Sequence, residues 1–97
     1  MQLPTEGLAH HPQVATGPDD TLFVTWDETV AGARRAVVAR ARPGSDAPKF
    51  ERTIVSDERP AVYPAIAVAG STTVVAWTAN RGQSSVIAVT TLANESR

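Results

Sequence analysis

One internal repeat constrains the fold of this chain more than any other feature of the sequence. The stretch HPQVATGPDDTLFVTWDE, which begins at His11, matches YPAIAVAGSTTVVAWTAN, which begins at Tyr63, once a gap of one residue is allowed. The matching positions lie 50 to 52 residues apart and are Pro12 with Pro64, Ala15 with Ala67, Trp26 with Trp77 and Gly32 with Gly82. Beyond the glycines, AVVAR from Ala36 aligns with VIAVT from Val86 at the spacing of 50. Unrelated hairpins do not usually share three consecutive segments, so the sequence predicts two copies of one structural unit.

Each copy is composed of short apolar runs separated by turn residues. PQVA and PAIAVA open with proline, which lacks an N–H and is tolerated at the first residue of a strand, so each is predicted to be an inner strand. TLFVTW and TTVVAW have apolar or small residues on both faces, which is typical of a central strand covered on both sides. RRAVVAR and SSVIAVTTL follow glycine-containing turns, and only the first copy has a fourth segment, KFERTIV. The sequence therefore predicts an all-β chain with four strands in the first copy and three in the second.

Residues 31–42 also fit a helix on composition, because AGARRAVVARAR is rich in alanine and arginine. The equivalent segment of the second copy, SSVIAVTT, is rich in β-branched residues and poor in helix formers. Since two copies of one repeat share a backbone, we predict a strand in both.

The length and the period together predict the architecture. A chain of 97 residues can bury one modest core, and a period near 50 residues built from short strands is the spacing of one β-propeller blade. We therefore predict two consecutive antiparallel blades of a β-propeller. Residues 11–56 form the first blade, residues 57–97 a second, incomplete blade, and residues 1–10 the tail of a preceding blade or a linker. A small immunoglobulin-like β-sandwich also accommodates seven strands in about 100 residues, but it leaves the repeat unexplained.

Composition excludes several classes of function. Nine Lys and Arg residues against ten Asp and Glu residues give a formal net charge of -1, which provides no broad attraction for nucleic acid or an anionic membrane. The chain has no cysteine, and thus neither a disulfide framework nor a thiolate metal site. No stretch approaches the ~18 apolar residues of a membrane span, and the N-terminus has no secretory signal pattern. We expect a soluble chain without a cofactor or a metal, and the sequence leaves its compartment open.

The pattern shared by the two copies resembles a known family. A proline followed by Val or Ile and Ala, a turn, an apolar strand that ends in Trp, and then a glycine and a strand such as AVVAR are similar to the blades of sialidase-like β-propellers, the group that includes bacterial neuraminidase repeats. The resemblance covers residues 11 to about 92. In that family an aspartate box, Ser-x-Asp-x-Gly-x-x-Trp/Phe, lies between the third and fourth strands. ARPGSDAPKF stands there in this chain, with Phe50 in the aromatic position and Asp46 displaced.

The resemblance implies a non-catalytic scaffold or a glycan-binding or protein-binding surface. The alternative is a C-terminal fragment of an exo-sialidase-type glycoside hydrolase, whose longer parent protein would be extracytoplasmic. Closed propellers have at least four blades, so the expected partners are further blades or other copies of the chain, with a glycan as ligand. The second copy stops after SSVIAVTTL, which predicts an unpaired sheet edge, and MQLPTEGL is the segment of the same chain that is available to complete it.

Candidate site residues are the positions at which the two copies differ, because the scaffold explains the positions that agree. They are Tyr63, which stands in place of His11, together with Asp27, Glu28, Arg34 and Arg35. The two carboxylates directly follow a strand and so lie where general acid or base chemistry is feasible, but we favour a solvated turn. Adjacent strand residues point to opposite faces, so Asp27 and Glu28 are not expected to form a dyad.

The remaining polar candidates also have simpler interpretations. His10 and His11 lack the spacing that aims two imidazoles at one metal ion, so we predict an exposed pair and no metal site. Sialidases use a tyrosine nucleophile, and Tyr63 is the one tyrosine of this chain, but packing at the start of its strand is the favoured interpretation. We therefore assign no catalytic residue, and we favour a protein without enzymatic activity of its own.

Overall fold

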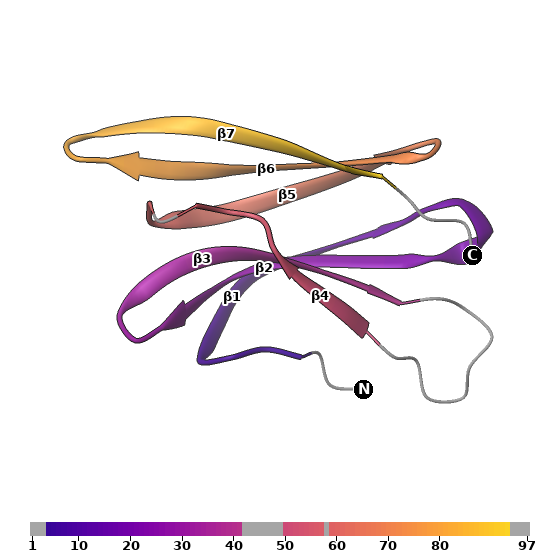
Figure 1. Cartoon of the computed structure of the whole chain (residues 1–97), viewed down its shortest axis with the longest axis horizontal. Helices are drawn as coiled ribbons and strands as arrows, with labels where there is room; N and C mark the ends of the chain where they lie inside the picture. Colours follow the sequence, from indigo (N-terminus) through magenta and orange to yellow (C-terminus); the bar gives the residue numbers. More distant parts are fainter. Residues whose placement is uncertain (1–3, 42–49, 58, 94–97) are drawn as a thin grey trace.

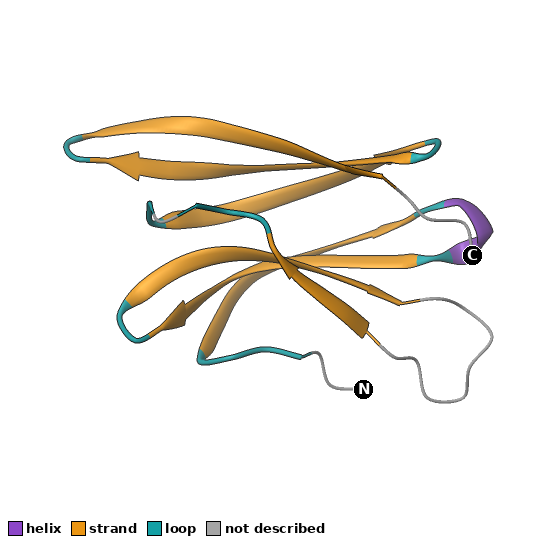
Figure 2. Ribbon diagram, in the orientation of Figure 1, coloured by secondary structure: helices purple, strands orange, loops and turns teal. Residues whose placement is uncertain are grey.

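The computed structural model describes residues 4–41, 50–57 and 59–93. These residues form seven β-strands and one short 3-10 turn, with no α-helix among them (Figure 2). The elements are β1 (Leu8–Thr16), η1 (Pro18–Asp20), β2 (Leu22–Val30), β3 (Ala33–Ala41), β4 (Phe50–Ile54), β5 (Ala61–Ala69), β6 (Thr72–Arg81) and β7 (Ser84–Ala93). The all-β prediction is confirmed, and so is the preference for a strand over a helix after residue 32. Asp46 and most of the ARPGSDAPKF segment lie outside the described residues.

The strands form two antiparallel sheets that lie one above the other (Figure 1). The first sheet has the order β1-β2-β3-β4 and the second has the order β5-β6-β7, so each sheet is made of strands that are consecutive in sequence. The predicted four strands of the first copy and three of the second are therefore confirmed. β1 begins at Leu8 rather than at residue 11.

A β-bulge at the same place in both sheets shows the repeat in the backbone itself. The pairing of β1 with β2 shifts between His10 and Gln13, and the pairing of β5 with β6 shifts between Val62 and Ala65. In each sheet the two bulged residues lie opposite a tryptophan, and the second bulged residue is a proline. The first bulged residue, His11 or Tyr63, has a positive φ of 56° or 54°. Left-handed backbone is unusual for such side chains, so its recurrence marks one shared local structure.

The register corrects one part of the sequence alignment. Trp26 lies opposite Val37 and Trp77 lies opposite Ala88, so the third strands are equivalent at a spacing of 51 residues, the same as the tryptophans. The predicted spacing of 50 beyond the turn is wrong. Ala31, with a φ of 52°, is the equivalent of Gly82, with a φ of 61°. The sequence alignment matches Gly32 with Gly82, because glycine is the usual residue at positive φ. In the structure, Ala31 adopts the conformation that is equivalent to that of Gly82. A shift of one residue exchanges the two faces of a strand, so this correction decides which side chains are equivalent.

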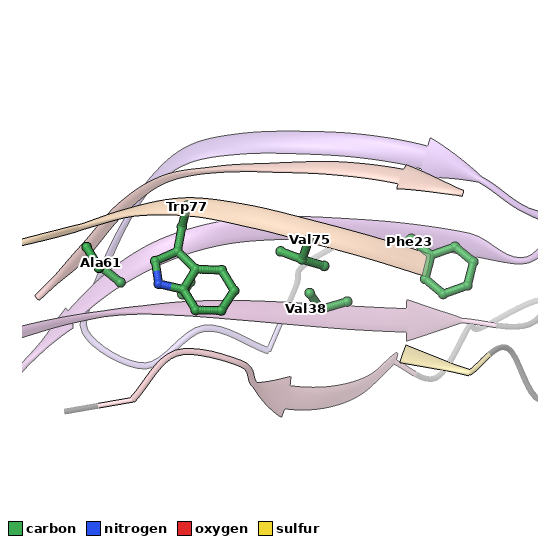
Figure 3. Packing of buried hydrophobic residues seen from close by; sticks show 7 residues of the cluster. Phe23, Val38, Ala61, Val75 and Trp77 are labelled. Carbon is green, nitrogen blue, oxygen red and sulfur yellow. The ribbon is translucent and has the colours of Figure 1, made fainter. Parts of the chain in front are cut away.

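The main core lies between the two sheets. It contains Phe23, Ala36 and Val38 from the first sheet and Ala61, Val75, Trp77 and Ala79 from the second. Figure 3 shows Trp77 and Val75 of β6 lying against residues of the first sheet. Alternate residues of each strand point to opposite faces, and the odd-numbered residues of β2 and β6 therefore face this core.

A smaller cluster covers the opposite, outer face of the first sheet. It consists of Val24, Trp26, Val37 and Ala39, with Leu22 and Phe50 packed against it. Trp26 and Trp77 are 1% and 5% exposed, so both are buried at equivalent positions of the two copies. Trp77 points from the second sheet toward the first, and Trp26 points from the first sheet away from the second. The two tryptophans thus point in the same direction along the stack of sheets.

Candidate functional site

The two candidate carboxylates lie inside a strand and not in a solvated turn. β2 continues past Trp26 to Val30, and the side chains of Asp27 and Glu28 are both completely buried. The prediction of a solvated turn is therefore wrong. The sequence suggested it because charged residues rarely occur in a buried strand unless they are paired, and the partners come from segments far along the chain.

Asp27 joins the two sheets. Its carboxylate accepts a hydrogen bond from the backbone N–H of Tyr63 at 2.9 Å and pairs with His11 Nδ1 at 2.8 Å. Arg34 Nη2 on β3 completes the set by pairing with the other carboxylate oxygen. The contact with Tyr63 crosses from the first sheet to the bulge of the second. Asp27 thus holds the start of β5 against the first sheet while Arg34 balances its charge.

These contacts keep Asp27 ionised. Burial alone raises the pKa of a carboxyl group, but the hydrogen bonds from His11, Arg34 and the Tyr63 N–H outweigh it, and the pKa of Asp27 lies below its ordinary value. An ionised carboxylate with three partners is a poor proton donor. Its geometry fits a structural role at the junction of the sheets.

Glu28 is the centre of a second group of polar contacts on the outer face of the first sheet. Arg52 of β4 binds it in a bidentate manner, with Nη1 to Oε1 at 2.9 Å and Nη2 to Oε2 at 2.6 Å. Arg35 Nε donates to Oε2 at 2.9 Å, and Trp26 Nε1 donates to Oε1 at 2.9 Å. The backbone N–H of Glu6 also donates to Oε1, at 3.2 Å. We call these residues the Glu28 cluster: Glu6, Trp26, Glu28, Arg35 and Arg52.

The Glu28 cluster also attaches the segment that precedes β1. Arg52 Nη1 donates to the carbonyl oxygen of Pro4 at 2.9 Å, and Arg35 Nη2 pairs with the Glu6 carboxylate at 3.0 Å. Burial opposes ionisation of Glu28, but the bonds from Arg52, Trp26, the Glu6 N–H and Arg35 lower its pKa to about 2. Bidentate guanidinium–carboxylate pairing of this kind is among the stronger polar contacts in proteins.

The structure brings the five candidates into two groups. Tyr63, Asp27 and Arg34 meet between the sheets, whereas Glu28 and Arg35 meet on the outer face. The two carboxylates do not form a dyad, as predicted from the alternation of strand residues. The sequence analysis missed Glu6 and Arg52 as partners. Arg52 lies in a predicted strand on the same face as Trp26 and Glu28, but that relation depends on the pairing of β3 with β4, which a pattern alone does not give.

Exposed rings lie beside the Asp27 contacts. The Tyr63 side chain is 62% exposed, and its ring centroid lies 4.2 Å from that of His11, which in turn lies 5.9 Å from that of His10. The ring of Tyr63 thus contacts His11 near the start of β5 but is largely exposed, and its backbone is anchored by Asp27. His10 and His11 are both exposed, as expected.

The part of the chain that the structure describes contains no group of three or more His, Cys, Asp or Glu side chains arranged to hold a metal ion. Among the same residues, no helix has the length and apolar character needed to cross a membrane. No protein-family model, curated protein or solved structure matches the chain.

Proposed function

We propose that this chain is a pair of consecutive β-propeller blades that serves as a non-catalytic scaffold, and that the outer face of the second sheet receives a further blade. We call this surface the open face. The residues that the register places on it are uncharged and include Val62, Ala65, Ala67, Val74, Ala76, Thr78, Ile87, Val89 and Thr91.

The observation that carries the proposal is the contrast between equivalent positions of the two sheets. At the spacing of 51, Ile87 and Val89 are the equivalents of Ala36 and Val38. Ala36 and Val38 are 0% and 3% exposed because the second sheet covers them, whereas Ile87 and Val89 are 69% and 61% exposed. A large contiguous apolar surface on a soluble protein is typical of an interaction site. The first sheet thus provides a template for what the open face binds: another sheet whose tryptophan points toward it.

The proposal is tested by lengthening the chain with a further copy of residues 57–97 after Arg97. In a repeat protein each added unit buries the exposed face of its neighbour, so stability increases with the number of units. We expect the longer chain to unfold in a single transition at a higher urea concentration, with a larger dependence on urea because more surface becomes exposed on unfolding.

The matched control is the same longer chain with the added copy of Trp77 replaced by Ala, which removes the side chain that would pack on the open face. We expect this control to lose the gain in stability. If the added copy leaves the urea midpoint unchanged, the two sheets form a self-sufficient β-sandwich and the propeller proposal is wrong.

Glycan binding is a narrower version of the same proposal, and it is supported by the exposed ring of Tyr63 beside His11. Aromatic rings with an exposed face are common in ligand-binding surfaces. The alternative of a sialidase-type hydrolase fragment requires a carboxylate that polarises the tyrosine hydroxyl. Asp27 instead contacts the Tyr63 N–H, and Glu28 lies on the opposite face of β2 and is bound by two arginines. The scaffold role is therefore the better supported of the two.

A further inference from the structure

The four outer edges of the two sheets differ in how they are protected. β1 and β5 each carry a proline within a bulge, Pro12 and Pro64, and β4 is five residues long with Glu51 and Arg52 near its middle. Prolines, bulges, short strands and charges are the usual devices that prevent an edge from pairing with another chain. β7 has none of them: its ten residues, SSVIAVTTLA, contain no charge, proline or glycine.

The repeat shows that the edge of β7 has room for a further strand. In the first sheet, residues 37–41 of β3 pair with β4, from Val37 with Ile54 to Ala41 with Phe50. The equivalent residues of β7 are 88–92, and no described strand pairs with them on the side away from β6. Within the part of the chain that the structure describes, residues 88–92 therefore leave one side open to a further strand.

The described part of the chain has no strand to spare for this edge. β4 is already paired with β3. The segment before β1, which the sequence analysis named as the donor, is held at the first sheet, because the Glu6 N–H donates to Glu28 and Arg52 donates to the Pro4 carbonyl. Figure 1 shows the described residues before β1, 4–7, beside the first sheet and on the far side of the molecule from β7.

We propose that the edge of β7 pairs with β7 of a second copy of this chain, antiparallel across a twofold axis near Val89, to form one continuous six-stranded sheet. A second copy is the occupant that fits, because it brings an identical unprotected edge and places no like charges opposite one another. Residues 86–92 are rich in Val, Ile and Thr, which favour pairing in a sheet. The proposal goes beyond the scaffold role and does not depend on it, because no described strand pairs with this edge of β7, whether the two sheets are blades of a propeller or the halves of a sandwich.

The absence of native cysteine makes a direct test available. In single variants Ile87→Cys, Val89→Cys and Thr91→Cys, any disulfide must join two copies of the chain. Paired strands across a twofold axis bring residues near the axis within disulfide reach of their own counterparts. We expect mild oxidation to give a covalent dimer from Val89→Cys and little from Ile87→Cys or Thr91→Cys, because residue 87 then faces residue 91 of the other copy and lies about four residues, or ~13 Å, along the strand from its own counterpart.

The control variants Ala65→Cys and Ala67→Cys lie on the same face but on β5. In the proposed six-stranded sheet the two copies of β5 are separated by five strand spacings, or about 24 Å, so these variants should form no covalent dimer on oxidation. Equal cross-linking from β5 and β7 would mean that the open faces stack on each other, which overturns edge pairing. Failure of Val89→Cys to cross-link overturns it as well.

A second measurement uses charge instead of a covalent bond. Val89→Lys and Val89→Glu each place like charges opposite one another at the axis, and we expect each to weaken dimerisation by more than about tenfold in sedimentation equilibrium. Mixing the two variants should restore the dimer, because Lys then faces Glu. Circular dichroism of each variant alone verifies that it is folded. If the mixture remains monomeric while both variants are folded, Val89 does not lie at the contact; if the unmodified chain is monomeric at all accessible concentrations, no such pairing exists.

Discussion

At the scale of single residues, the two tryptophans share a position but differ in their polar contacts. Trp26 Nε1 donates to Glu28, whereas Trp77 Nε1 is buried and has no partner among the described residues. The reason is the residue two positions further on, which is Glu28 in the first sheet and Ala79 in the second. The pair therefore provides an internal comparison in which burial is nearly constant and one hydrogen bond is present or absent.

We expect Trp26→Phe to destabilise the chain by about 1 to 2 kcal/mol more than Trp77→Phe, because it alone removes a hydrogen bond to a charged group. Replacement of either tryptophan by Ala should cost about 3 to 5 kcal/mol, because both remove a large buried side chain. Urea unfolding followed by circular dichroism measures both. Equal losses for the two Phe variants would indicate that the bond to Glu28 contributes nothing to stability.

At the scale of elements, two glycines with positive φ have very different surroundings. A Cβ on Gly7, where φ is 64°, would lie 2.0 Å from the carbonyl oxygen of Thr29, whereas a Cβ on Gly32, where φ is 81°, would meet nothing within 4 Å. Gly7 is thus the point at which the segment before β1 turns closely over the end of β2. That close approach allows Glu6 to reach Glu28.

We expect Gly7→Ala to destabilise the chain clearly more than Gly32→Ala. Gly32→Ala introduces only the strain of an alanine in left-handed backbone, about 1 kcal/mol. Gly7→Ala must in addition displace the backbone, which disrupts the contacts of Glu6 and Pro4 with the Glu28 cluster. The free energies of unfolding of the two variants decide the matter. A Gly7→Ala variant as stable as Gly32→Ala would show that the segment before β1 adds little to the fold.

The strands were predictable from the sequence, but the register of the third strands and the burial of two charged residues were not. Apolar residues on both faces identified β2 and β6, and the β-branched partner SSVIAVTT identified β3 as a strand despite its alanines and arginines. The register beyond the turn was not predictable, because Ala31 adopts a backbone conformation that sequence patterns assign to glycine. The burial of Asp27 and Glu28 was also missed, because it depends on Arg34, Arg35 and Arg52, which only the pairing of strands brings near.

At the scale of the whole molecule, the stability of the chain in acid depends on its buried carboxylates. The pKa of Glu28 is lowered from 4.5 to about 2, and that of Asp27 is lowered as well. A carboxyl group whose pKa is lower in the folded chain contributes stability that is complete above its unfolded pKa and is lost as the pH falls toward its folded pKa. For Glu28 this loss falls between about pH 4.5 and pH 2.

We expect the free energy of unfolding to fall by roughly 3 kcal/mol across that interval through Glu28 alone, as measured by urea unfolding at a series of pH values. Glu28→Gln should be less stable at neutral pH, because Arg35 and Arg52 lose their charged partner, and its stability should depend less on pH below about 4.5. Glu51→Gln is the matched control, since Glu51 is exposed and its contact with Arg40 is long, at 3.4 Å. An unchanged pH dependence in Glu28→Gln would locate the acid sensitivity elsewhere.

The two outer faces of the sheet stack differ in chemical character, so the two ends of the stack are not equivalent. One end of the stack is closed by the Glu28 cluster, and the other presents Ile87 and Val89. A further unit would therefore meet an uncharged surface at one end, and at the other it would meet two guanidinium groups that are already bound to a buried carboxylate. Duplication of the second unit would lengthen such a stack without disturbing the first, whereas duplication of the first unit would carry the charged obstruction into the interior. The position of one glutamate thus makes the two ends of the stack chemically different.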